Sequence, residues 1–94
     1  MLKELLRVFV NDQDKLINKF RFAIESGNPR EVRLSAHSFR GSLRHLGVVA
    51  ASQVAGRIEE LATVDPSLNG ASELCEQFSS LVEEAVVEIV RYLE

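Results

Sequence analysis

The chain has 94 residues, of which 46% are hydrophobic and 6% aromatic, and its formal net charge is −3. This length supports one small domain with a single core, and the acidic balance argues against nucleic-acid binding. No apolar run approaches the roughly 18 residues of a membrane span, and no signal peptide opens the chain, so we expect a cytoplasmic domain without a membrane contact. The single cysteine, Cys75, excludes an internal disulfide and is typical of a reducing compartment.

The first part of the chain predicts two amphipathic helices. Apolar residues recur every three or four positions over residues 2–10, which indicates a short first helix. The polar run N-D-Q-D at positions 11–14 is rich in residues that cap helix N-termini. We therefore expect a second helix over residues 12–26, ended by Gly27, a residue that readily adopts a positive φ.

Three further helices follow, each with recognisable end signals. The run N-P-R-E at positions 28–31 combines a capping residue, a proline in the first turn and an early acidic residue. It predicts a helix over 29–46, which Gly47 should end. Apolar periodicity then predicts a fourth helix over 49–63 and a fifth over 71–93.

These elements define the expected fold class. No segment reads as a strand, and short connections between amphipathic helices imply antiparallel neighbours. We predict an all-α protein, an antiparallel four-helix bundle in which residues 2–10 form a short N-terminal lid helix across one end.

The helix over 29–46 divides into two distinct faces. At about 100° per residue, His37 points away from the apolar stripe that contains Phe39 and Leu43. The residues on the same side as His37 are Arg30, Arg33, Leu34, Arg40, Gly41 and Arg44. Four arginines against one glutamate make this helix basic within an acidic chain, which indicates an anionic ligand or an acidic partner surface.

The run A-H-S-F-R-G-S-L-R-H-L-G at positions 36–47 resembles the phosphorylation motif of histidine-containing phosphotransfer (HPt) domains. In that family the motif usually reads Ala-His-x-Leu-Lys-Gly-Ser/Ala, with a further glycine near the helix end. His37 matches the phosphorylated histidine, Gly41 and Ser42 match the small residues, and Gly47 matches the terminating glycine. The resemblance extends over nearly all of residues 1–94, because the family fold is a four-helix bundle of about this length.

The resemblance implies a phosphorelay intermediate, a carrier without ATP binding or autokinase activity. His37 would accept a phosphoryl group from the aspartyl phosphate of a receiver domain and pass it to another receiver. Arg40 stands where the family usually has Lys; it would offset charge on the phosphoryl oxygens, while Gly41 leaves clearance for docking. The expected partners are receiver domains or a hybrid sensor kinase. The protein is expected to be a monomer without a cofactor of its own, and Mg²⁺ would be supplied by the receiver.

Other residues around His37 have less definite roles. Two roles are open for Arg33 and Arg44. They either help to stabilise the phosphoryl group or to dock the partner, or they are part of an ordinary solvated face. Leu6, Val10 and Leu34 are predicted to contact the partner, provided that they are partly exposed beside His37.

Alternative interpretations remain open at this point. Gly41 is either the docking clearance or an ordinary close-packing glycine. His45 is expected to lie on the flank of the helix without a role, and Cys75 to be a small core or boundary residue. At the level of function, the alternatives are an interaction module that docks a receiver or kinase without carrying phosphate, and a purely structural or self-associating bundle.

Overall fold

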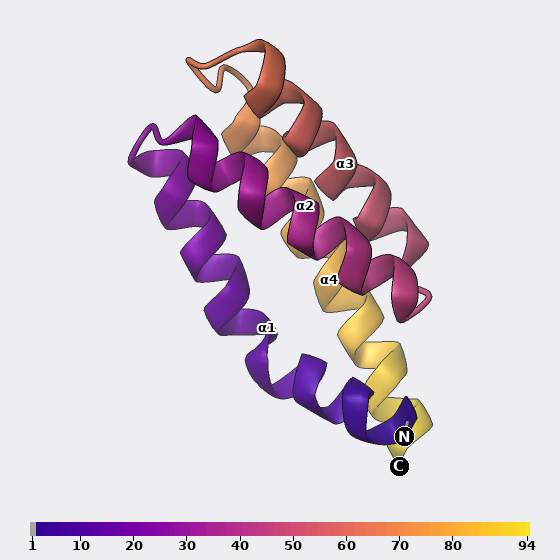
Figure 1. Cartoon of the computed structure of the whole chain (residues 1–94). Helices are drawn as coiled ribbons and strands as arrows, with labels where there is room; N and C mark the ends of the chain where they lie inside the picture. Colours follow the sequence, from indigo (N-terminus) through magenta and orange to yellow (C-terminus); the bar gives the residue numbers. More distant parts are fainter. Residues whose placement is uncertain (1) are drawn as a thin grey trace.

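The computed structural model describes residues 2–94, which form four α-helices joined by short turns (Figure 1). The helices are α1 (Leu2–Glu25), α2 (Pro29–His45), α3 (Val49–Val64) and α4 (Ala71–Leu93). Consecutive helices run antiparallel, and both ends of the chain lie at the same end of an elongated bundle of 42 × 19 × 18 Å. The predicted all-α four-helix bundle is therefore confirmed. Within residues 2–94, none of the helices combines the length and apolar character that crossing a bilayer requires.

The turns on either side of α2 follow the predicted end signals. The side chain of Asn28 accepts a hydrogen bond from the backbone N–H of Glu31 at 3.2 Å, and Pro29 occupies the first turn, where its missing N–H costs nothing. Gly27 and Gly47 have φ values of +67° and +83°, a backbone region that other residues rarely adopt. These local interactions fix both ends of the helix that carries His37.

The predicted break between residues 2–10 and 12–26 is wrong, because α1 continues through it as one helix. Asn11, Asp12 and Asp14 are exposed, so solvent satisfies their side chains and they do not end the helix. Phe9 and Ile17, on either side of this run, are both buried, with Val10 and Gln13 half-buried between them, and this burial favours an unbroken helix. Figure 1 shows α1 changing direction near its middle, so that its first part lies across the end of the bundle where the lid was expected.

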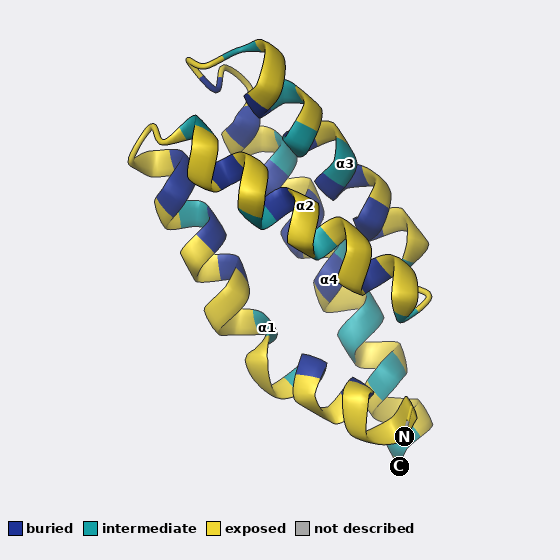
Figure 2. Cartoon of the chain, viewed as in Figure 1, coloured by how far each residue is buried: buried dark blue, intermediate teal, exposed yellow. Residues whose placement is uncertain are grey.

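The core is built around three phenylalanines from three helices. Phe20 and Phe78 are completely buried, and Phe39 packs against both, with ring centroids 5.1–5.6 Å apart. Cys75 is also buried in this core. Buried residues lie on the inward faces of all four helices (Figure 2). Of the helix pairs that pack side by side, α2–α3 is the most extensive and α1–α2 the least extensive, so α3 is the element that most constrains α2.

Candidate functional site

His37 lies in the middle of α2 and points into solvent. Its side chain is 64% exposed, whereas Ala36 and Leu43 on the opposite side of the helix are fully buried. The apolar stripe of α2 packs against the core and thereby fixes the outward direction of the histidine. The outward orientation expected from helical periodicity is what the structure shows.

A glutamate from the neighbouring helix holds the imidazole. Nδ1 of His37 lies 2.7 Å from Oε2 of Glu59 on α3, and the Glu59 side chain is only 21% exposed. An ionised carboxylate can only accept a hydrogen bond, so Nδ1 donates to it, and a neutral ring then carries its lone pair on Nε2. No hydrogen bond from residues 2–94 occupies Nε2, which makes it the nitrogen available for reaction.

The same carboxylate also lies beside Arg40. Nη1 of Arg40 is 3.4 Å from Oε1 of Glu59. That oxygen is buried and has no well-aligned hydrogen bond within the described residues, so the contact is a loose ion pair rather than a hydrogen-bonded one. The Arg40 side chain is 46% exposed. Its guanidinium can therefore interact with a group bound at His37 without leaving a tight partner.

Gly41 lies on the exposed side of α2 one turn after His37. Apart from its chain neighbours and the adjacent backbone of α2, a Cβ atom at this position would have no heavy atom within 4 Å. The interpretation of Gly41 as a close-packing glycine is therefore wrong. A helix-interior glycine costs about 1 kcal/mol relative to alanine, and within residues 2–94 no packing contact offsets that cost.

The other predicted site residues separate into exposed and buried ones. Arg33 and Arg44 are exposed on the His37 side of α2 and form no ion pair with residues 2–94. Leu34 is 50% exposed and Val10 is half-buried. Leu6, however, is only 5% exposed, so its expected exposure is wrong. The bend in α1 turns this part of the helix onto the bundle, and Leu6 becomes a core residue.

An apolar groove runs between α1 and α2, the helix that carries His37. It has a volume of about 390 Å³, and Leu34, Phe39 and Leu43 of α2 line it together with Phe9 and Leu16 of α1. A smaller cavity continues along α1 and is lined by further apolar side chains, two of them largely exposed: Leu5 at 50% and Val8 at 57%. His45 lines this second cavity and makes no hydrogen bond or ion pair within the described chain.

Sequence reasoning missed Glu59, Leu5 and Val8. Glu59 is 22 positions from His37, and only the packing of α3 on α2 brings the two together. The sequence of α3 held only a partial signal, since Ser52, Gly56 and Glu59 recur at helical spacing and therefore share one face. Leu5 and Val8 fall outside the buried stripe of α1, and that departure from simple amphipathicity marks an exposed apolar surface.

The site offers no arrangement for a resident metal ion. Within residues 2–94, no three His, Cys, Asp or Glu side chains cluster in a way that could hold one. The polar groups around His37 are instead a carboxylate and arginines, which can orient an imidazole and interact with an anionic group.

Comparison with known proteins agrees with this geometry. The family model described as "Hpt domain" matches residues 4–90. The fold is similar to the crystal structure of histidine-containing phosphotransfer protein B (HptB) from Pseudomonas aeruginosa PAO1, with a TM-score of 0.90 and 25% sequence identity, covering 97% of this chain and 78% of that one. No curated protein sequence matches the chain. The chain belongs to the Hpt domain family, and its role is histidine phosphotransfer in phosphorelay signalling with receiver domains as partners.

Proposed function

We propose that Nε2 of His37 is the atom that carries the phosphoryl group. The observation that supports this most directly is the 2.7 Å contact between Nδ1 and Glu59, which orients the ring and leaves the opposite nitrogen facing solvent. Phosphoryl transfer depends mainly on positioning and electrostatic stabilisation. A nucleophile fixed on a helix and held by a carboxylate meets the first requirement.

The proposed step transfers the group without a net change in protons. The Nε2 lone pair attacks phosphorus and forms the N–P bond, while the P–O bond to the receiver's aspartate breaks and the aspartate leaves as a carboxylate. The ring keeps its proton on Nδ1 and becomes positively charged, which Glu59 offsets through the existing contact. Reversal of the same step passes the group to a second receiver.

Arg40 would stabilise the negative charge on the phosphoryl oxygens. It lies one turn from His37 on α2 and is tied to Glu59 only by a 3.4 Å contact. A guanidinium can donate two parallel hydrogen bonds to phosphate, so an arginine at this position preserves the charge that the family's usual lysine supplies. Arg33 and Arg44 would add positive charge on the same side of α2.

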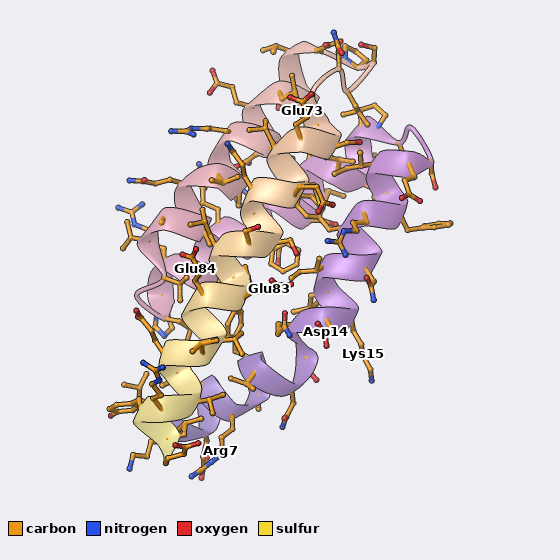
Figure 3. The ribbon with its side chains drawn as sticks, turned by 180° about the vertical axis from the view of Figure 1, so that it is seen from behind. Arg7, Asp14, Lys15, Glu73, Glu83 and Glu84 are labelled. Atoms are coloured by element: carbon orange, nitrogen blue, oxygen red, sulfur yellow. The ribbon has the colours of Figure 1, made fainter. Side chains whose placement is uncertain are left out.

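The proposal also includes how a receiver docks. The apolar groove between α1 and α2, bordered by Leu5, Val8 and Leu34, would receive an apolar surface of the receiver. Gly41 would leave room for the receiver's loops. Glu31 and Asp12 also line these cavities, while Figure 3 shows the acidic residues Glu83 and Glu84 on α4, with the molecule seen from behind.

We further propose that the protein acts as a cytoplasmic monomer, and that Mg²⁺ enters the reaction bound to the receiver. A hybrid sensor kinase would be one source of the phosphorylated receiver. The exposed positive charges around His37 are suited to the acidic pocket that holds such an ion in a receiver. This chain's own contribution is then the nucleophile, its orientation and the surrounding arginines.

Phosphotransfer from a labelled receiver tests the assignment. The protein is mixed with a phosphorylated receiver domain and Mg²⁺, and the label on the protein is expected to be acid-labile and base-stable. His37→Gln should abolish labelling, whereas His45→Gln should retain it. Labelling that depends on His45 would overturn the assignment, and receiver binding without any labelling would assign a non-phosphorylated interaction module instead.

A further inference from the structure

Gly56 on α3 is the one glycine in the described chain against which another residue's side chain packs closely. A Cβ atom at this position would lie 3.3 Å from Cδ of Arg40, closer than carbon atoms normally approach. At the other four glycines a Cβ would meet no heavy atom within 4 Å beyond its chain neighbours and the local helix backbone. Gly56 lies inside α3 and is not among the positive-φ glycines, so backbone conformation does not require it.

Two further residues on the same face of α3 also contact Arg40. Ser52, one turn before Gly56, donates a hydrogen bond from Oγ to the backbone carbonyl of Arg40 at 3.0 Å. Glu59, one turn after Gly56, places Oε1 3.4 Å from Nη1 of Arg40. Along α3, the Ser52 hydroxyl therefore contacts the backbone of Arg40, and the Glu59 carboxylate contacts its guanidinium. Between them, the space at Gly56 accommodates the aliphatic stem of the same arginine.

The contact at Gly56 determines the path of the Arg40 side chain. The arginine stem lies close against α3 where a side chain at position 56 would otherwise project. A larger residue there would lift the stem away from α3 and move the guanidinium away from Glu59 and His37. Charge stabilisation in phosphoryl transfer requires donors already in place, so this displacement should reach the reacting group.

We propose that Gly56 is a positioning residue for phosphoryl transfer, acting through Arg40. Its missing side chain leaves the space in which the arginine stem lies, and this clearance allows an arginine to serve at position 40. The inference rests on the proposed role of His37 and Arg40, and it adds a residue on another helix to that site.

The test is a double-mutant cycle between positions 56 and 40, measured as the initial rate of phosphotransfer from a phosphorylated receiver. Gly56→Leu should slow transfer roughly tenfold, as should Arg40→Ala, because the first displaces and the second removes the same positioned and partly exposed charge. In the Arg40→Ala background, Gly56→Leu should cause no further loss. Gln53→Leu, which introduces the same side chain at an exposed position of α3, should transfer at the wild-type rate.

A smaller substitution keeps the test valid if Gly56→Leu does not fold. Gly56→Ala requires Arg40 to move by a few tenths of an ångström and should slow transfer by about two- to threefold. Its thermal unfolding midpoint should not fall, because alanine is the better helix former.

The outcomes separate this inference from the proposed function. A wild-type protein that accepts no label contradicts the function itself. Normal transfer by folded Gly56→Leu and Gly56→Ala contradicts only the role of Gly56. An equal loss in the wild-type and Arg40→Ala backgrounds also overturns the inference, because Gly56 would then act through some other group.

Discussion

Nδ1 of His37 on α2 and Oε2 of Glu59 on α3 are 2.7 Å apart, which makes the histidine part of a pair that spans two helices. Glu59 is mostly buried while His37 is mostly exposed, so the carboxylate acts as a fixed support for a solvent-facing ring. The pair leaves Nε2 as the ring nitrogen without a partner among the described residues, and in the proposed step it would place a negative charge beside the ring as the ring becomes positive.

Removing the charge of Glu59 should therefore slow phosphotransfer. Glu59→Gln keeps an oxygen that can accept from Nδ1 but loses the negative charge, and Glu59→Ala loses both. We expect Glu59→Ala to lower the initial transfer rate by about 10- to 100-fold, with Glu59→Gln between it and the wild type. Glu60→Gln, at the exposed neighbouring position, is the matched control; a comparable loss there would mean that Glu59 has no special role.

Substitutions at Gly41 should change the rate of phosphotransfer and the stability of the fold by different amounts or in opposite directions. Because a Cβ there meets no neighbouring residue, Gly41→Ala should stabilise the fold by about 1 kcal/mol through helix propensity alone. Gly41→Gln should slow transfer strongly while the thermal unfolding midpoint changes little, because its side chain would obstruct the receiver. Calorimetry and phosphotransfer assays on the same samples check both, and parallel losses would count against the clearance role.

The groove between α1 and α2 should contribute to receiver affinity. Val8→Ala and Leu34→Ala each remove exposed apolar surface, and we expect each to raise the Kd by at least about fivefold, equivalent to about 1 kcal/mol. Isothermal titration with a receiver and Mg²⁺ measures this. Val64→Ala alters a side chain that is 73% exposed at the far end of α3 and should bind normally. Unchanged affinity in both groove variants would place docking elsewhere.

The phenylalanine cluster should dominate the stability of the bundle. Phe78 is fully buried and contacts two other rings, so Phe78→Ala should lower the free energy of unfolding by about 3–5 kcal/mol. Phe22, which is 70% exposed on α1, provides the control, and Phe22→Ala should stay within about 0.5 kcal/mol. Urea unfolding of the two variants makes the comparison. Similar losses would contradict the assignment of the core.

Cys75 should be unreactive in the folded protein. Burial raises the pKa of its thiol, which the nearby positive charge of Arg21 only partly opposes. A raised pKa leaves less thiolate at neutral pH, and the thiolate is the form that reacts. Iodoacetamide should therefore modify the native protein much more slowly than the urea-unfolded protein, as followed by mass spectrometry. Equal rates would show that the thiol is accessible.

The sequence alone determined the helical fold and the orientation of the histidine. Both depend on local chemistry: the cap formed by Asn28, the positive φ of Gly47, and an apolar stripe that turns His37 outward when Leu43 turns inward. The family motif in α2 is contiguous, so it was recognisable without any tertiary information.

Only the tertiary structure decided what surrounds that histidine. Glu59 and Gly56 reach His37 and Arg40 through the packing of α3 on α2, and neither contact leaves a mark on the sequence near α2. The continuity of α1 was also decided globally, because burial of Phe9 and Ile17 on one face outweighs the capping tendency of the polar residues between them. Local signals specify where helices begin and end, whereas the contacts between distant residues depend on how whole helices pack.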